Sequence, residues 1–488
     1  MPSRFLVIAT ACVAFLAAPA RGDEQKPVSY HRDIRPIFNA NCNACHKPDK
    51  SKGDLDMTTF AALVKGGKNG SPIEGGKPDK SLLFDMIHGD KPEMPSEGDP
   101  LKPGQVALIE RWIKEGAKDD TPAPGSTKVE PPVYAAPPVI TSLAYSPDGT
   151  LLAVSGYHEV LLHKSDGSGI VARLTGEGPR VESIEFTKDG KYLGVAAGSP
   201  GEFGQVQIYE VATHKAVKVI QPSTDSLYGL SFSPDGKTVA VGAADKVARL
   251  IGVEDGKVHI EFKAHSDWVL GTVFSLDGKQ FVTGGRDKAM KLVEVETGRF
   301  VDDINNPLEQ VLCMARHPKE EQVLFGGDLG VARVYRISDN QGRTAGRNDT
   351  NLILAFERQP GPVSAAAFSP DGTQVALGTI NDVKIYDAKG KPPEAKDMKG
   401  KKPEGKGKGK PPKETKALLT LSGHQGPVFA VAYKPDGSAI ATGGFDGTIR
   451  LYDPKTGDLV KQFVPVPIAG AKLPETRPTT LPAAASAE

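Results

Sequence analysis

The sequence has few cysteines and almost no tryptophan. Four of its 488 residues are cysteine and two are tryptophan. A disulfide-stabilised scaffold carries more cysteine than this, so we exclude that class of protein. Cys313 lies in the apolar run EQVLCMARHP, where we expect an inert core thiol. Cys12 lies near the start of the chain, which leaves Cys42 and Cys45 as the cysteines available for chemistry.

The sequence also lacks an excess of charge of either sign. Its 60 basic and 60 acidic residues give a formal net charge of zero. A protein that binds nucleic acid through bulk charge carries a basic excess, so we expect no nucleic-acid partner. A local excess occurs at 389–416, where eleven lysines face four acidic residues. This composition cannot bury a core and predicts a disordered insertion.

Long apolar runs are absent after the first residues. The start, MPSRFLVIATACVAFLAAPARGD, has a short basic region, an apolar run from Phe5 to Ala18 and then small residues. This is the form of a secretory signal peptide at 1–22, cleaved after Ala20 or Gly22. The run is short for a membrane span, so an uncleaved anchor is the weaker alternative. We expect a periplasmic or otherwise exported protein with no transmembrane segment after cleavage.

Residues 23–120 predict a small all-α domain. The stretch SYHRDIRPIFNA predicts a short helix capped by Ser29. The stretch SLLFDMI predicts a second helix with its cap at Asp79. In LKPGQVALIERWIKEGA, Pro103 favours a helix start and Gly116 a helix end, which predicts a longer third helix.

Seven copies of one pattern follow a Pro-rich stretch at 121–138, which predicts a semi-rigid linker. Each copy is an apolar strand, a turn of the P-D-G type and a second strand, as in LAYSPDGTLLAVSG and VAYKPDGSAIATGG. The copies are about 41 to 46 residues apart at first and farther apart across two insertions. A period in the forties with four short strands per unit is typical of a β-propeller. We therefore predict an all-β seven-bladed propeller at 139–465 and a disordered tail at 466–488.

These repeats resemble the WD-repeat family over nearly all of 139–465. Tyr-Asp or Val-Glu pairs stand where the family usually has Trp-Asp. In this family a histidine, a serine or threonine and an aspartate of one blade form a structural hydrogen-bond network. Two sets match this order: His265, Thr283 and Asp287, and His424, Thr442 and Asp446. The resemblance implies that these histidines are structural and that the propeller makes protein–protein contacts.

The motif CNACH at 42–46 allows three kinds of site. A thioredoxin-like dithiol needs a βαβ context, which the predicted helices do not provide. A structural zinc site needs four ligands, and His31 and His88 would at most complete an irregular set. Haem attachment needs only what is present: two thiols one helical turn apart for thioethers to the haem vinyls, and an adjacent histidine for the iron. We therefore expect one covalent haem c held by Cys42, Cys45 and His46.

A second axial ligand is expected downstream of the motif. Met94 precedes a proline, which disfavours helix at that residue and leaves its side chain free to face the iron. Met86 lies in an apolar helix, where we expect core packing, and Met57 has no comparable placement. His88 is the rival, which would make a bis-histidine haem. A His46 and Met94 pair of iron ligands raises the reduction potential and fills both axial sites, which favours electron transfer over catalysis.

Residues 28–118 resemble the planctomycete-type cytochrome c domain. The stretches YHRDIRPIF, CNACH, GGKPDKSLLFDMI, EMP and LKPGQVALIERWIKEGA occur in that family's order. Domains of this family are exported, bind one haem c and are often fused to larger modules, including propellers. The resemblance implies that Cys42, Cys45, His46 and Met94 bind the haem. It identifies no redox partner.

Two functions fit this domain order. We expect an exported mono-haem c-type cytochrome that transfers single electrons, with the propeller as a protein-interaction platform. The alternative is a periplasmic haem-dependent oxidoreductase whose propeller holds a substrate or second-cofactor site; a haem with a purely structural role is a third reading. An enzyme needs further ligands in the propeller, where Trp268 is the one tryptophan. The other candidates form no recognisable ligand pair: His158, His163, His214, His259 and His317.

Overall fold

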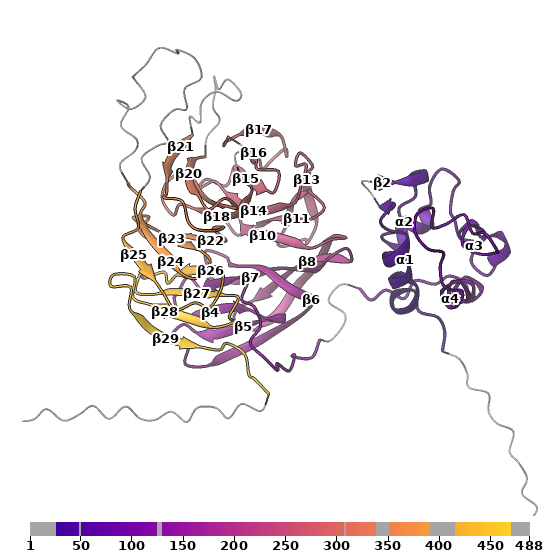
Figure 1. Ribbon diagram of the computed structural model, residues 1–488, viewed down its shortest axis with the longest axis horizontal. Helices are drawn as coiled ribbons and strands as arrows, with labels where there is room; N and C mark the ends of the chain where they lie inside the picture. Colours follow the sequence, from indigo (N-terminus) through magenta and orange to yellow (C-terminus); the bar gives the residue numbers. More distant parts are fainter. Residues whose placement is uncertain are drawn as a thin grey trace, which may run out of the picture. The chain divides into compact units, whose positions relative to one another are not determined.

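The computed structural model describes residues 26–47, 50–123, 129–306, 309–337, 351–390 and 415–469. The predicted signal peptide at 1–22, most of the predicted insertion and most of the predicted tail lie outside these residues. The chain divides into two compact units, residues 1–121 and residues 122–488 (Figure 1). Among the described residues, no helix is both long and apolar enough to cross a bilayer.

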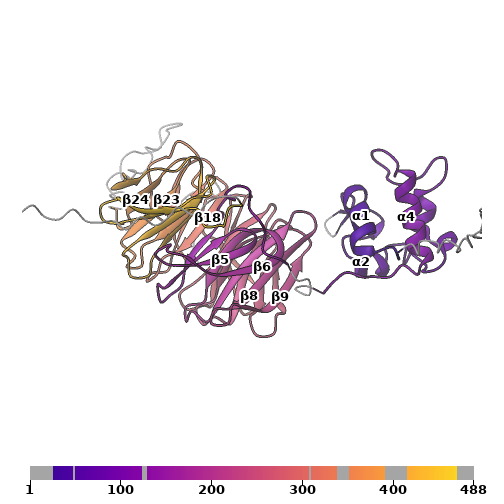
Figure 2. The ribbon, with the colours of Figure 1, turned by 90° about the horizontal axis from the view of Figure 1, so that it is seen from below.

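The first unit is mainly helical, and Figure 2 shows several of its helices. Its helices are the π-helical turn η1 (Tyr30–Ile34), α1 (Arg35–Asn41), the 3₁₀ turn η2 (Lys52–Asp54), α2 (Phe60–Lys65), the 3₁₀ turn η3 (Pro78–Lys80), α3 (Leu82–Ile87) and α4 (Pro103–Lys114). The Ser29 side chain accepts a hydrogen bond from the Arg32 backbone N–H at 2.9 Å, which confirms the predicted cap. The unit packs around Trp112, whose ring stacks on Tyr30 at 5.4 Å between centroids.

Two expectations for the first unit are wrong. It is not all-α, because β1 (His46–Lys47) pairs with β2 (Lys50–Ser51) in a short antiparallel hairpin. Strands of two residues are too short to show the apolar–polar alternation by which a sequence reveals a strand. The cap predicted at Asp79 is also wrong. Asp79 lies inside η3, which the fixed φ of Pro78 favours, and α3 begins only at Leu82.

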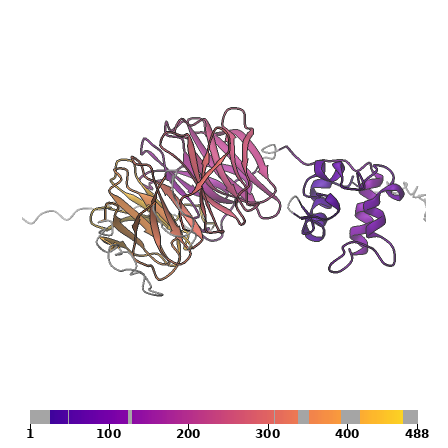
Figure 3. The ribbon, with the colours of Figure 1, turned by 90° about the horizontal axis from the view of Figure 1, so that it is seen from above.

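The second unit is built from antiparallel strands, whose sheets follow one another in Figures 1 and 3. One sheet has seven strands: β3 (Leu143–Tyr145), β4 (Leu151–Ser155), β5 (Tyr157–Lys164), β6 (Ile170–Phe186), β7 (Tyr192–Ser199), β8 (Phe203–Glu210) and β9 (Lys215–Ser223). The long strand β6 pairs with β5 through its first part and with β7 through its second part. It therefore joins two four-stranded groups.

The remaining strands form five four-stranded sheets within the described residues. They are β10 (Leu227–Phe232), β11 (Thr238–Ala243), β12 (Ala248–Gly252), β13 (Val258–Phe262); β14 (Val269–Phe274), β15 (Gln280–Gly285), β16 (Met290–Glu294), β17 (Phe300–Asp303); β18 (Val311–Arg316), β19 (Gln322–Gly327), β20 (Ala332–Arg336), β21 (Leu352–Ala355); β22 (Ala365–Phe368), β23 (Gln374–Gly378), β24 (Val383–Asp387), β25 (Leu419–Leu421); and β26 (Val428–Tyr433), β27 (Ile440–Gly444), β28 (Ile449–Tyr452), β29 (Leu459–Phe463). Each group begins with one of the seven sequence repeats. The predicted insertion falls between β24 and β25.

The recurring Asp-Gly turn explains why six of the seven repeats form a hairpin. In the first repeat the Ser146 hydroxyl bonds to the Asp148 carboxylate, and that carboxylate accepts the Thr150 backbone N–H at 3.0 Å. Ser146 Oγ also accepts the Leu151 N–H at 2.9 Å. Gly149 has a φ of 70°, which glycine adopts at little cost. The side chains of the turn therefore replace the missing strand hydrogen bonds where the chain reverses.

The last sheet packs against the first and closes the propeller. Ile140 and Leu143 share a buried cluster with Ala430 and Ile449. The Ile140 backbone N–H also donates to the Gly444 carbonyl at 3.0 Å. Because the first and last repeats meet, the sheets complete a ring with no open sheet face at the join.

Ordered chain continues on both sides of the predicted range 139–465. Tyr134 forms a parallel bridge with Ile468, and its carbonyl accepts the Ala469 N–H at 2.8 Å. Tyr134 and Val466 pack with Leu161 in a small buried cluster. Residues from the predicted linker and the first residues of the predicted tail therefore belong to the packed part of the second unit. We name this contact between the two segments the terminal clasp.

Candidate functional site

The end of α1 places two cysteines and a histidine on one turn. The Cys42 N–H donates to the Phe38 carbonyl at 2.8 Å, which continues the helical pattern by one residue. The N–H groups of Cys45 and His46 both donate to the Cys42 carbonyl at 3.1 Å. Both cysteines are free thiols. The turn therefore presents Cys42, Cys45 and His46 together, as attachment to one haem would require.

A cavity of about 780 Å³ lies beside this turn. Cys42, Cys45, His46 and Met94 all contribute to its lining. Cofactor sites are commonly clefts of about 300–1,000 Å³ with largely apolar walls. Apolar side chains supply much of this wall: Leu55, Met57, Leu82, Leu83, Met86, Ile87 and Leu101. The volume and the apolar wall suit a flat, largely apolar macrocycle such as haem.

His46 has an unused ring nitrogen at this cavity. Its Nδ1 atom is buried and has no hydrogen-bond partner among the described residues. A buried polar atom without a partner costs about 1–3 kcal/mol and needs an explanation such as a ligand. The His46 carbonyl accepts the Met57 N–H at 2.9 Å, which fixes the backbone at this position. A histidine with a fixed backbone and an unpartnered ring nitrogen at this cavity is compatible with binding haem iron.

The residues around Cys42 do not supply the ligands of a zinc site. Burial raises the pKa of the Cys42 thiol to about 11, and the nearby Cys45 acts in the same direction. His31 and His88, which a zinc site would need, are exposed and do not line the cavity. These residues fit haem attachment and do not assemble a four-ligand zinc site.

Met94 reaches the cavity from the loop between α3 and α4. Its backbone N–H donates to the Met86 carbonyl at 2.9 Å, and its half-buried side chain packs against the core of the unit. The structure thus brings Met94 to the same cavity as His46. Met86 and Met57 line this cavity too, although the sequence indicated only core packing for Met86 and no role for Met57.

The rival ligand His88 lies elsewhere. Its ring is exposed and stacks on Phe84, with 4.4 Å between the ring centroids. Its Nδ1 lies 2.9 Å from the Phe84 carbonyl oxygen, to which it can donate. Because His88 is engaged with its own helix and does not line the cavity, the geometry favours Met94 over His88.

Two charged residues at the cavity were missed by sequence reasoning. Lys52 Nζ lies 3.1 Å from Glu97 Oε1, and both residues line the cavity. They lie 45 positions apart in the sequence. No local pattern joins a lysine and a glutamate at this separation, so the sequence carried no signal for the pair.

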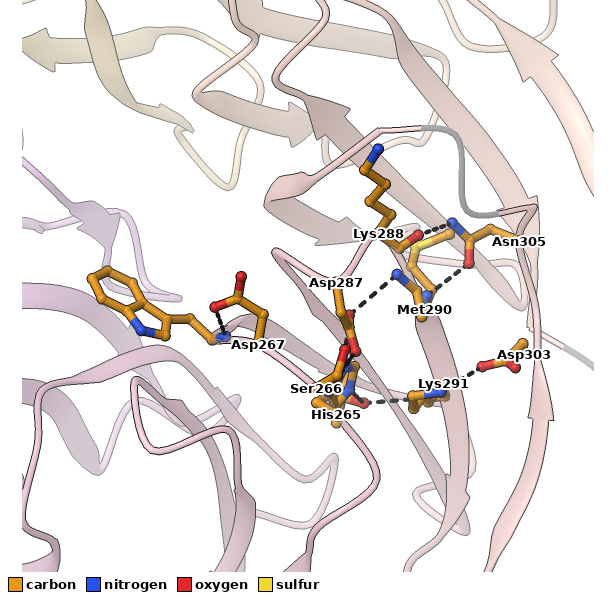
Figure 4. Close-up of polar contacts among 12 residues, drawn as sticks. His265, Ser266, Asp267, Asp287, Lys288, Met290, Lys291, Asp303 and Asn305 are labelled. Atoms are coloured by element: carbon orange, nitrogen blue, oxygen red, sulfur yellow. Dashed lines mark hydrogen bonds and ion pairs between the residues drawn. The ribbon is translucent and has the colours of Figure 1, made fainter. Parts of the chain in front are cut away.

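The first predicted histidine network of the propeller is confirmed, and Figure 4 shows its His265 and Asp287 side chains. His265 Nδ1 lies 2.9 Å from the Asp287 carboxylate, and His265 Nε2 lies 2.7 Å from the Thr283 hydroxyl. Burial opposes ionisation of Asp287, but the hydrogen bonds from His265 and from the Ser266 and Ala289 N–H groups hold its pKa below the usual value. The network satisfies buried polar groups within one sheet, which is a structural role.

The second network contains a residue that the family pattern did not include. His424 Nε2 lies 2.7 Å from the Thr442 hydroxyl, as predicted. On the other side Arg450 lies 3.1 Å from His424 Nδ1 and 2.9 Å from the Asp446 carboxylate, while His424 and Asp446 are 3.9 Å apart. Burial, with the Arg450 charge acting in the same direction, lowers the pKa of His424 to about 4. His424 is therefore neutral at neutral pH.

Two of the propeller histidines considered for chemistry contact backbone carbonyls. His163 Nε2 lies 2.9 Å from the Pro465 carbonyl, and His317 Nε2 lies 3.2 Å from the Gly372 carbonyl. Burial raises the pKa of the Cys313 thiol to about 12, as expected for an inert core thiol. These contacts leave the cavity of the first unit as the candidate site for chemistry.

Comparison with known families agrees with this division of the chain. A family model described as Planctomycete cytochrome C matches residues 42–98, which include the cysteine motif and Met94. A second, described as WD domain, G-beta repeat, matches residues 214–251, 256–293 and 415–453. The two families match different units of the structure.

Curated relatives match short parts of the chain. Coronin-7 of Rattus norvegicus is 44% identical over 52 residues, which are 11% of this chain and 6% of that protein. A guanine nucleotide-binding protein subunit beta of Arabidopsis thaliana is 43% identical over 51 residues, which are 10% of this chain and 14% of that protein. This chain thus spans a small fraction of their length. From the two family matches, the chain carries a planctomycete-type cytochrome c domain fused to WD repeats.

Proposed function

We propose that this chain is an exported c-type cytochrome with one covalent haem, which transfers single electrons while its seven-bladed propeller binds another protein. The observation that carries the proposal is the cavity lined by Cys42, Cys45, His46 and Met94. Export agrees with the signal-like sequence at 1–22, since c-type haem is attached outside the cytoplasm.

The residues of the cavity have distinct roles in this proposal. Cys42 and Cys45 would hold the haem through thioethers, and His46 and Met94 would bind its iron. When bound, the haem supplies one-electron redox chemistry. The apolar wall around it excludes water and favours the less charged form of the site. Because His46 and Met94 would both bind the iron, no position would remain there for a substrate, which favours electron transfer.

The propeller offers an aromatic and cationic contact site for a partner protein. The Trp268 side chain is about one-third exposed and stacks on Tyr228 at 5.8 Å between centroids. The Arg286 guanidinium lies 4.6 Å from the centre of the Trp268 ring. Tryptophan, tyrosine and arginine are the residues most enriched at binding hot spots. These contacts support a recognition role for the propeller.

Carbon monoxide distinguishes a carrier from a catalyst. The chain is produced in a host that attaches c-type haem, purified and reduced with dithionite. We expect sharp visible bands that do not change when carbon monoxide is added, because both axial positions are filled. A reduced spectrum that shifts with the gas would contradict electron transfer through a fully ligated iron and favour an open, catalytic site.

A further inference from the structure

Lys52 and Glu97 join the two segments that carry the proposed axial ligands. The Lys52 Nζ atom lies 3.1 Å from Glu97 Oε1. We infer that they form a positioning pair, which holds the loop bearing Met94 across the cavity and so sets how readily the Met94 sulfur leaves the iron. The inference rests on the proposed function, because it requires haem in the cavity.

Lys52 belongs to the wall that carries the cysteine motif. Its backbone N–H donates to the Cys45 carbonyl at 3.1 Å, and it begins the 3₁₀ turn η2. A few residues later, the Met57 N–H donates to the His46 carbonyl at 2.9 Å. The chain around Lys52 is therefore fixed by hydrogen bonds to Cys45 and His46 themselves. A displacement of Lys52 would therefore also displace the segment that carries Cys45 and His46.

Glu97 lines the same cavity from a separate segment of the chain. It lies on the Met94 loop, which we define as residues 88–102 between α3 and α4. The Met94 N–H donates to the Met86 carbonyl at 2.9 Å, and Leu101 is buried in the core of the unit. Glu97 lies between these two anchors and lines the cavity. The ion pair therefore ties the middle of the loop to the wall that carries His46.

The expected effect of this pair is small but measurable. The Lys52 and Glu97 side chains are 45% and 75% exposed, so water and salt screen their attraction. Exposed ion pairs contribute about 0.2–1 kcal/mol, which corresponds to about 1.5- to 5-fold in an equilibrium constant. Loss of the pair should therefore raise the fraction of molecules with Met94 detached by about that factor.

Imidazole binding measures the fraction of molecules in which Met94 is detached. Imidazole binds the ferric iron only in those molecules. It is neutral in mildly basic buffer, so a change of protein charge does not attract or repel it. We expect the full-length Lys52→Gln and Glu97→Gln variants each to bind imidazole about 1.5- to 5-fold more tightly than the parent chain. The double variant should bind no more tightly than either single variant, since both remove one shared interaction. The charge swap Lys52→Glu with Glu97→Lys should restore the parent affinity.

Two controls separate the pair from a general loss of charge. Glu110→Gln breaks the Lys114–Glu110 contact of 3.8 Å on α4, outside the cavity lining, and should leave imidazole binding unchanged. In about 1 M salt, where the Debye length is about 3 Å, the difference between parent and variants should disappear. Coloured variants that all bind imidazole like the parent, or whose effects simply add, would overturn the positioning pair alone. A colourless parent chain would overturn the proposed function together with the pair.

Discussion

At the scale of single residues, the proposed function depends most on Met94. It lines the cavity that Cys42, Cys45 and His46 also line, and it is the one of these four that lies far from the motif. A thioether sulfur opposite a histidine raises the reduction potential of haem. In the proposed function, Met94 therefore determines both the reduction potential and whether the iron has a free position.

Replacing Met94 with Ala should open the iron. We expect the reduced Met94→Ala variant to bind carbon monoxide and its reduction potential to fall by on the order of 100 mV. Visible spectra with and without the gas, and a redox titration, measure the two effects. The matched control is Met86→Ala, which alters another methionine of the same wall and should still exclude the gas. A Met94→Ala protein that excludes carbon monoxide would show that another residue is the ligand.

Some of these residues were predictable because their signal is local. The motif at 42–46 forms one turn, so sequence spacing already determines which side chains meet. Met94 lines the cavity, as expected from its place before a proline, and its role as an iron ligand stays a prediction. Lys52 and Glu97 were not predictable, since they meet only through the path of the chain around the cavity. Arg450 was also missed, because it enters the His424 network from a different strand of the sheet.

At the scale of secondary-structure elements, two propeller sheets contain buried hydrogen-bond networks around His265 and His424 in addition to apolar packing. In the last sheet, burial lowers the pKa of His424 from 6.5 to about 4. Between these two pH values the unfolded chain binds a proton at His424 and the folded chain does not. Since the unfolded state then holds more protons, the stability of the propeller should fall as the pH falls through this window.

The His424→Gln variant tests this dependence. One pKa unit corresponds to 1.36 kcal/mol, so His424 should cost the parent propeller on the order of 3 kcal/mol between pH 7 and pH 4. The variant should lose correspondingly less over the same range, whatever its stability at pH 7. Urea unfolding followed by circular dichroism at several pH values gives both slopes. Equal slopes for parent and variant would show that His424 does not titrate as its burial indicates.

Some secondary-structure elements could be predicted from the sequence and others could not. The propeller strands recur seven times, and six of the repeats share an Asp-Gly turn whose chemical cause is seen in the Ser146 and Asp148 contacts, so the repeats were recognisable. The hairpin of β1 and β2 has two residues per strand and no repeat. The start of α3 was misplaced because Pro78 and Asp79 form a separate 3₁₀ turn, which a capping pattern does not distinguish from a helix start.

At the scale of the whole molecule, the terminal clasp joins residues from the two ends of the second unit. The Tyr134 hydroxyl donates to Glu159 at 2.7 Å, and Arg173 binds the same carboxylate with two contacts of 2.7 Å. The Glu159 side chain is fully buried. Because Tyr134 and Ile468 are distant in the sequence and pair through one bridge, no periodicity indicated the clasp.

Removing one hydroxyl should weaken the clasp. We expect Tyr134→Phe to lower the free energy of unfolding of the propeller by about 1–3 kcal/mol, since it deprives a buried carboxylate of a hydrogen bond. Urea unfolding followed by circular dichroism measures the change. The matched control is Tyr157→Phe, whose side chain is 51% exposed and should change little. Equal stability of the Tyr134→Phe and Tyr157→Phe proteins would show that the clasp does not stabilise the propeller.

The central claim is that Cys42 and Cys45 bind one haem covalently. The most direct test is the alkaline-pyridine spectrum of the full chain, made in a host that attaches c-type haem, before and after extraction with acidified acetone. We expect one haem per chain, a band position typical of a haem with both vinyl groups saturated, and no transfer of colour to the acetone. A colourless protein, or a haem that the acetone removes completely, would contradict the account.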